Sequence, residues 1–298
     1  MMAAKFVSAG TAEPVGASMA MFEGFRDEMV ELPEATLRVR YGGSGPPVLL
    51  LHGFPDSSAL WRHQIPALVD AGHRVIAPDL RGFGASDRPD GVAAYALPTL
   101  LADVLGILDA VGVERADVVG HDWGAGLGWM LASLAPQRVQ RYVALSVGRS
   151  TDYFLDMRQR EMSWYMLLFL FEGVAEEALR RDGWALLRAW LRDPVDLERY
   201  IADLSRPGAL TAALSYYRAN LPVEVLAGVA DSRALPPVAC PVLGVWSDGD
   251  LGCGEAQMLA SEKHVTGPWR YHRIEGAGHW IPLDAPDELN ALLVDYLR

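Results

Sequence analysis

Strand-like and helical segments alternate along most of this chain, and this alternation limits its possible folds more than any other feature. Residues 97–112 carry apolar side chains at helical spacing, and so do the last residues of the chain. The later strand-like segments lack in–out alternation, as is typical of parallel strands covered on both faces. The sequence therefore predicts an α/β fold with a mostly parallel, doubly wound sheet. The strand-like segments lie at residues 28–32, 36–43, 47–53, 74–80, 116–122, 141–148, 240–250 and 270–276.

The alternation stops between residues 150 and 232, where no convincing strand appears. This stretch predicts short helices, at residues 161–173, 175–191, 196–204 and 209–220. The simplest topology is a helical cap inserted into one α/β domain, above the edge where the strands end. We expect a core made of residues 22–149 and 233–298, a cap at 150–232, and an N-terminal extension at 1–21.

Composition excludes several classes of partner. The net charge of −12 provides no basic face for a nucleic acid. The longest apolar run, residues 164–171, is far shorter than the roughly 20 residues of a membrane span. Cys240 and Cys253 are the only cysteines and have no metal-type spacing. We expect a cytoplasmic protein that binds a small molecule, with no membrane, nucleic acid or metal partner.

The segment "VVGHDWGAGLG" has the pattern of a nucleophile elbow, a sharp turn from a strand into a helix. Gly120 and Gly124 flank the central residue at the two positions where a side chain would collide as the turn tightens. The central residue is Asp122, where many such turns carry a serine. Alone, this pattern also fits an ordinary loop with a capping aspartate.

Two further segments supply partners for Asp122 in the order nucleophile, acid, base. His279 lies in the Gly-rich "GAGHW", just past a predicted strand. Asp250 follows the preceding strand and is the preferred acid to orient His279. Asp248 is the competing candidate, although it suits a turn position.

A third segment, "HGFP", lies in the loop after another core strand. The backbone N–H of Phe54 in this loop and that of Trp123 in the elbow predict an oxyanion hole. Such a hole stabilises the negative oxygen that forms when water attacks an ester.

Together, "HGFP", "PDLRGFGASDRP", "GHDWGA", the late aspartate and "GAGHW" occur in the order found in a known family. The chain resembles the epoxide hydrolases of the α/β-hydrolase fold, across nearly its whole length. The resemblance implies that fold with an inserted cap, an aspartate nucleophile and no cofactor. By resemblance alone, it also implies a homodimer.

The resemblance implies two cap tyrosines that hold the oxirane oxygen. Tyr165, in "WYMLLFLFEG", and Tyr217, in "SYYRAN", stand at the matching places, and Tyr216 does not. Tyr165 and Tyr217 each lie on an apolar helix face, although a tyrosine there often only packs. We expect further cap residues to line the substrate cavity with Phe54, namely Trp164, Met166 and Leu168.

A carboxylate nucleophile suits an sp³ carbon, because displacement there forms an alkyl ester of the enzyme. We therefore expect an epoxide hydrolase that forms a vicinal diol through such an ester, which water activated by His279 then hydrolyses. One alternative is a haloalkane or haloacid dehalogenase that uses the same Asp122, with indole N–H groups for the halide. In that class Asp152 is a competing acid. A non-catalytic ligand-binding relative is the third alternative, although it would be expected to lack part of the triad.

Overall fold

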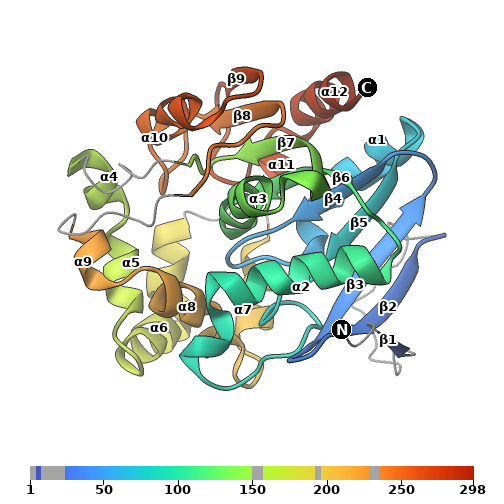
Figure 1. The fold of residues 1–298 in the computed structure, drawn as a ribbon. Helices are drawn as coiled ribbons and strands as arrows, with labels where there is room; N and C mark the ends of the chain where they lie inside the picture. The colour runs from blue at the N-terminus through green and yellow to red at the C-terminus, as the bar shows by residue number, and fades with distance from the viewer. Residues whose placement is uncertain (1–4, 8–23, 150–156, 192–195, 228–234) are drawn as a thin grey trace.

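The computed structural model describes residues 5–7, 24–149, 157–191, 196–227 and 235–298. Within these residues, the fold is centred on one nine-stranded sheet (Figure 1). The strand order is β1-β2-β3-β5-β4-β6-β7-β8-β9. β1, β2, β3 and β5 pair antiparallel in that order, and all pairings from β5 to β9 are parallel. This confirms the predicted mostly parallel sheet. The strands are β1 (Lys5–Val7), β2 (Arg26–Glu31), β3 (Thr36–Gly43), β4 (Pro47–Leu51), β5 (Arg74–Pro78), β6 (Ala116–His121), β7 (Val139–Leu145), β8 (Val242–Ser247) and β9 (Trp269–Ile274).

Helices cover both faces of the sheet, as a doubly wound fold requires. Helices α2 and α3 pack together on one face, and α1 and α12 pack together on the other (Figure 1). Every residue of β6 and β8 is buried, which explains why these strands show no polar alternation. The core helices are α1 (Gln64–Asp70), α2 (Leu97–Ala110), α3 (Trp123–Leu134), α10 (Glu255–Leu259), α11 (Ile281–Asp284) and α12 (Pro286–Leu297), with 3₁₀ turns η2 (Ser58–Trp61), η3 (Val92–Tyr95), η4 (Pro136–Arg138) and η5 (Ala260–His264).

Among the described residues, six helices lie between β7 and β8 in sequence and gather beside the sheet, at the left of Figure 1; we refer to these helices together as the cap. The predicted helix at 161–173 is two helices, because Ser163 is non-helical (φ −91°, ψ 16°). The predicted helix at 175–191 is also interrupted, by positive φ angles at Asp182, Gly183 and Trp184. The six helices are α4 (Met157–Met162), α5 (Trp164–Phe169), α6 (Val174–Leu191), α7 (Leu197–Leu204), α8 (Ala209–Asn220) and α9 (Val223–Leu226).

The predicted boundaries of the cap, residues 150 and 232, lie outside the described residues, as does Asp152. Within the predicted N-terminal extension, β1 is the edge strand of the sheet, where its residues pair with β2. Part of this segment therefore belongs to the sheet.

A buried polar network joins the helical cap to the loop after β4. Asp56, in that loop, accepts hydrogen bonds from the Tyr200 hydroxyl and the Arg199 guanidinium of α7, both at 2.8 Å. Arg62 donates to Asp196 at 2.7 Å, just before α7. Because charge-assisted hydrogen bonds between partly buried groups have defined geometry, this network fixes α7 against the core.

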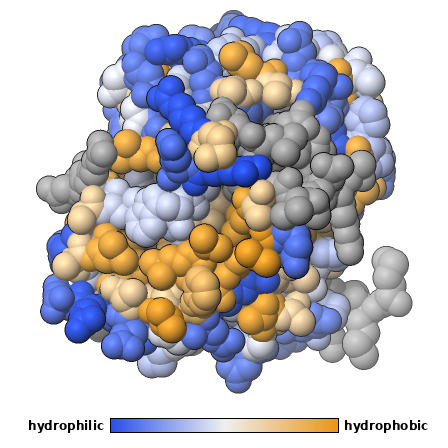
Figure 2. All heavy atoms as spheres, turned by 90° about the vertical axis from the view of Figure 1, so that its left-hand side faces the viewer, coloured by the Kyte–Doolittle hydropathy of each residue, from blue (hydrophilic) through white to orange (hydrophobic). Residues whose placement is uncertain are grey.

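The outer face of the cap has an apolar patch surrounded by polar side chains, as Figure 2 shows for the side of the molecule on which the cap lies. On α5 the sides differ: Trp164 and Leu167 are exposed, whereas Tyr165 and Phe169 are buried. The large exposed apolar side chains of the cap are Met157, Trp164, Leu167, Phe171, Val174 and Val223. Among the described residues, no helix combines the length and apolar character needed to cross a membrane.

Candidate active site

The elbow places Asp122 between the end of β6 and the start of α3. Its backbone has φ 54° and ψ −120°, a strained conformation for a residue with a side chain. A Cβ on Gly120 would lie 2.4 Å from the carbonyl oxygen of Gly124, and one on Gly124 would lie 2.0 Å from that of Leu51. Only glycine fits these two positions, and the turn therefore holds Asp122 at the carboxyl edge of the sheet.

The loop after β4 contacts the carboxylate of Asp122 directly. The backbone N–H of Phe54 donates to Asp122 Oδ1 at 2.7 Å. Gly53 makes this contact possible, because a Cβ there would lie 2.1 Å from the same oxygen. The glycine of "HGFP" is thus a functional position that the sequence reasoning missed. Trp123 begins α3, so its backbone N–H belongs to the first helical turn and has no intrahelical acceptor.

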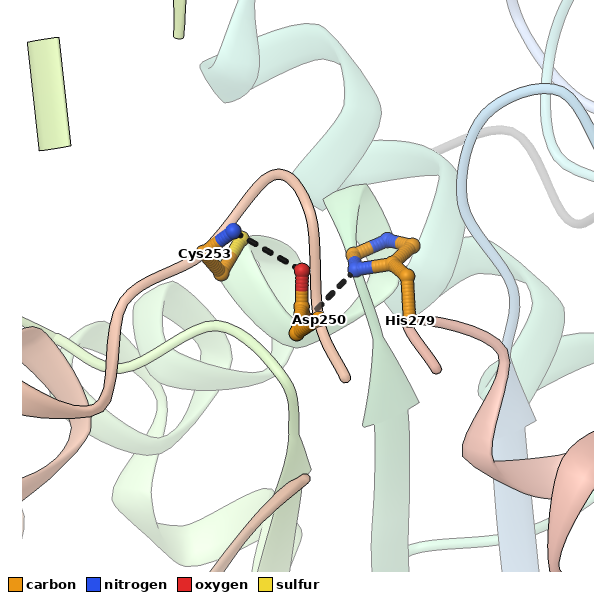
Figure 3. Close-up of side chains that lie close together, drawn as sticks. All are labelled: Asp250, Cys253 and His279. Atoms are coloured by element: carbon orange, nitrogen blue, oxygen red, sulfur yellow. Dashed lines mark hydrogen bonds and ion pairs between the residues drawn. The ribbon is translucent and has the colours of Figure 1, made fainter. Parts of the chain in front are cut away.

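His279 lies between Asp122 and Asp250. Its Nδ1 is 2.8 Å from Asp250 Oδ2, and its Nε2 is 3.7 Å from Asp122 Oδ2. Asp250 Oδ1 accepts the backbone N–H groups of Gly252 and Cys253, both at 2.8 Å, and Figure 3 shows Asp250 bridging Cys253 and His279. Both oxygens of Asp250 are therefore satisfied, and its side chain is fully buried.

Asp248, the competing acid, lies elsewhere. Its Oδ1 accepts the backbone N–H of Gly276 at 2.7 Å, and its other oxygen faces Arg273. This is the turn role that its sequence context suggested.

Two buried side chains hold the backbone of His279 in place, and the sequence reasoning named neither of them as a site residue. His121 Nε2 donates to the carbonyl oxygen of His279 at 2.8 Å, and Ser146 Oγ donates to the same oxygen at 3.0 Å. Burial, together with the charge of the neighbouring His279, lowers the pKa of His121 to about 4. His121 therefore stays neutral. The sequence offered one signal for the role of His121, namely its place directly before Asp122 in the elbow.

The electrostatics of the site favour an ion pair before any reaction. Burial opposes charge on His279, but Asp250 and Asp122 raise its pKa well above the usual value. Burial likewise opposes charge on Asp122, yet His279, His121 and the Phe54 N–H hold its pKa below the usual value. The carboxylate is thus ionised at neutral pH, the form that a nucleophile needs.

A cavity of about 320 Å³ opens above Asp122 and His279. Two cap tyrosines line it, Tyr165 from α5 and Tyr217 from α8, with ring centroids 6.1 Å apart. Apolar walls and glycine backbone complete it. Its lining consists of Phe54, Asp122, Tyr165, Trp190, Leu191, Tyr217, Gly249, Leu251, Gly252, Gly278, His279, Trp280 and Asp284.

The lining of this cavity differs from the expected one at three residues. Trp164, Met166 and Leu168 do not line this cavity. Trp164 is 44% exposed on the outer face of the cap, because successive residues of a helix point about 100° apart and α5 turns Tyr165 inward. Trp190 takes the expected place, and its ring packs at a tilt of 35° against Tyr165, with centroids 4.2 Å apart. The interruption within α6 hid this inward position from the sequence pattern.

Tyr217 and its neighbour Tyr216 have different surroundings. The Tyr216 hydroxyl donates to the carbonyl oxygen of Arg81 at 2.7 Å, away from the cavity. Tyr217 packs edge-on against Trp123, with centroids 5.1 Å apart. Burial and the charge of Asp122 raise the pKa of Tyr217 well above the usual value, so the phenol keeps its proton, while a hydrogen bond with the Trp123 side chain opposes that rise.

Comparison with known proteins gives consistent matches. A family model described as the alpha/beta hydrolase fold matches residues 46–286. Epoxide hydrolase A of Mycobacterium tuberculosis (strain H37Rv) is 33% identical, over 91% of this chain and 97% of that protein. The crystal structure of epoxide hydrolase A from Mycobacterium thermoresistibile has 34% identity and a TM-score of 0.75, covering 92% of this chain and 98% of that one. The Bacillus megaterium epoxide hydrolase, solved with an inhibitor, has 27% identity and a TM-score of 0.81, covering 90% and 99%.

Proposed function

Because this chain belongs to the alpha/beta hydrolase fold family and is a hydrolase of its epoxide hydrolase group, we propose that it opens an epoxide to a vicinal diol through an ester on Asp122. One observation supports this mechanism above all: the ionised carboxylate of Asp122 lines the same cavity as the phenols of Tyr165 and Tyr217. His279, Asp250, Phe54 and Trp123 have the supporting roles.

In the first step, one oxygen of Asp122 attacks an oxirane carbon. The two oxygens are not equivalent, because Oδ1 accepts the Phe54 N–H and Oδ2 faces His279 Nε2. We assign Oδ2 as the attacking atom. Oδ1 then becomes the carbonyl oxygen of the ester and is already in contact with the donor that later stabilises it.

The leaving oxygen of an epoxide stays attached to the substrate as a strongly basic alkoxide. Tyr165 and Tyr217 line the same cavity as Asp122, and their hydroxyls are the proposed donors to this oxygen. A phenol whose pKa is raised stays protonated at neutral pH, as Tyr217 does, and can give a hydrogen bond or a proton.

In the second step, water attacks the carbonyl carbon of the ester. Forming the ester removes the charge of Asp122, and with it one of the interactions that raise the pKa of His279. His279 then releases its Nε2 proton to solvent and, as a neutral imidazole, accepts a proton of the attacking water through Nε2, while Asp250 holds Nδ1–H and stabilises the imidazolium. The imidazolium later gives this proton to the diol oxygen that leaves as the ester bond breaks. The Phe54 N–H stabilises the new oxyanion, with the Trp123 N–H as the proposed second donor.

A dehalogenase on the same carboxylate is the second candidate. One observation favours it: the buried Nε1 of Trp280, a cavity residue, has no hydrogen-bond partner within the described structure. A halide accepts such donors. Against it, the Trp123 side chain is engaged with Tyr217, and two phenols are unnecessary for a halide that needs no proton.

Single-turnover hydrolysis in ¹⁸O water tests the proposal. With excess enzyme and styrene oxide, we expect the diol to take its new oxygen from Asp122 and therefore to contain no ¹⁸O. The label should instead appear in the peptide that contains Asp122. A labelled diol after the first turnover would show direct attack by water and overturn the ester mechanism. Bromide or chloride release from a haloalkane, with no diol from any epoxide, would support the second candidate.

A further inference from the structure

Three different metal-ligating side chains meet at the wall of the cavity. A carboxylate oxygen of Asp250, a ring nitrogen of His279 and the Sγ of Cys253 all lie within 4.8 Å of one another (Figure 3). Asp250 and Cys253 are buried, and the thiol also interacts with the imidazole. The proposed reaction uses Asp250 and His279 but gives the thiol no function.

The donor set suits a soft or borderline divalent cation. Thiolate, imidazole and carboxylate are the ligands that Zn²⁺ and Cd²⁺ prefer, whereas Mg²⁺ and Ca²⁺ prefer oxygen alone. With Zn–S near 2.3 Å and Zn–N near 2.0 Å, tetrahedral ligands lie about 3.3 to 3.7 Å apart. The 2.8 Å between His279 Nδ1 and Asp250 Oδ2 therefore has to lengthen by less than about 1 Å.

The cavity gives access to this cluster. Gly249, Leu251, Gly252 and His279 form the adjoining wall. A Cβ at Gly252 would lie 3.5 Å from the Tyr165 hydroxyl oxygen and 3.7 Å from Asp250 Oδ1, so this glycine lies between the cavity tyrosine and the cluster. His279 lines the cavity and also belongs to the cluster, so a cation that enters the cavity reaches the cluster at this side chain, and solvent in the cavity is available as a fourth ligand.

We infer that Asp250, Cys253 and His279 form an inhibitory site for a thiophilic divalent cation such as Zn²⁺ or Cd²⁺. Starting from the imidazolium and the thiol, the cation replaces the Nδ1 proton and the Sγ proton, and both go to solvent. The imidazole keeps its remaining proton on Nε2, the nitrogen that faces Asp122. A ring in that state cannot accept a proton from water.

The inhibitory effect of this site rests on the proposed function, but binding of the cation can be measured without turnover. The probe is Cd²⁺ alone, titrated into the full chain while the ultraviolet charge-transfer band of a cadmium thiolate is recorded. The variants are Cys253→Ser and the matched control Cys240→Ser, which removes the other buried thiol. We expect the band in wild-type protein and Cys240→Ser, and its loss in Cys253→Ser.

A second readout locates the inhibited step. Under Cd²⁺, epoxide should still alkylate Asp122, so the ester should accumulate, and a chelator should restore its hydrolysis. For each variant, inhibition is measured relative to its own metal-free rate. The Cd²⁺ concentration that gives half-inhibition should be more than about tenfold higher in Cys253→Ser than in wild-type protein. The site is disproved if wild-type protein shows no thiolate band or if the band survives in Cys253→Ser. If the band behaves as expected but no epoxide is turned over, the cation site stands and the proposed function fails.

Discussion

His121 Nε2 donates to the carbonyl oxygen of His279 at 2.8 Å, so the residue before the proposed nucleophile holds the backbone of the proposed base. The centroids of the two imidazole rings lie 4.7 Å apart. His121 stays neutral because its burial lowers its pKa to about 4. This pairs the end of β6 with the loop after β9 through one hydrogen bond. His121 is therefore a positioning residue.

His121→Phe should slow hydrolysis of the ester more than its formation. One lost hydrogen bond of about 0.5 to 1.5 kcal/mol corresponds to roughly a 2- to 12-fold slower hydrolysis, with Ser146 retaining the second contact. Stopped-flow single turnovers separate the two steps. His121→Gln keeps an N–H donor and should retain most of the rate, and equal slowing of both steps in His121→Phe would contradict the positioning role.

His279→Gln should trap the covalent ester. Asp122 keeps the Phe54 N–H contact and can still attack, whereas no base remains to activate water. Protein incubated with epoxide should gain the mass of one substrate on the peptide containing Asp122, as mass spectrometry of a digest would show. Asp122→Asn is the control that should gain none. An adduct on any other peptide argues against Asp122 as nucleophile.

Tyr165→Phe and Tyr217→Phe should each slow alkylation by about 2 to 4 kcal/mol, or roughly 30- to 1,000-fold. Each phenol is proposed to act on the leaving oxygen, so hydrolysis of a preformed ester should change much less. Tyr216→Phe is the matched control, because its hydroxyl contacts the Arg81 carbonyl outside the cavity. If both variants alkylate at the wild-type rate, the two tyrosines are packing residues. If the protein releases halide from a haloalkane and the rate changes little in either variant, a dehalogenase is favoured.

Trp190→Ala should change substrate selection. Trp190 lines the cavity and packs against Tyr165, so its removal enlarges the site and should shift the kcat/KM ratio of a bulky to a small aryl epoxide by about tenfold or more. Trp164→Ala removes the same side chain from the outer face of the cap and should leave that ratio unchanged. The reverse pattern would mean that Trp164 faces the substrate, as the sequence had suggested.

Gly124→Ala should destabilise the fold, whereas Gly126→Ala should not. The new Cβ at 124 would lie 2.0 Å from the Leu51 carbonyl oxygen, which is backbone and cannot move aside, so we expect a loss of about 3 kcal/mol or more. At 126, in the same helix, nothing lies within 4 Å, and alanine should stabilise by about 0.5 to 1 kcal/mol. Urea unfolding measures both, and similar midpoints would show that the elbow tolerates a side chain.

The sequence by itself determined the features that depend on local pattern and chain order. Apolar runs bounded by glycine, proline and aspartate located the strands, since burial on both faces removes polar alternation. The elbow motif identified Asp122, because only glycine fits beside so tight a turn. Motif order alone was enough to group the chain with the epoxide hydrolases of the alpha/beta hydrolase fold.

Only the tertiary structure decided which side chains meet across the cavity. Asp250 and Asp248 are two residues apart in one loop, yet only Asp250 contacts His279, because the fold of that loop sends its neighbour toward Gly276. Trp190 replaced Trp164 in the cavity because a break within α6 and the packing of α5 set their directions. The contacts of His121, Gly53 and Cys253 join segments distant in sequence. Such contacts depend on how the strands and loops pack in three dimensions, which no local pattern encodes.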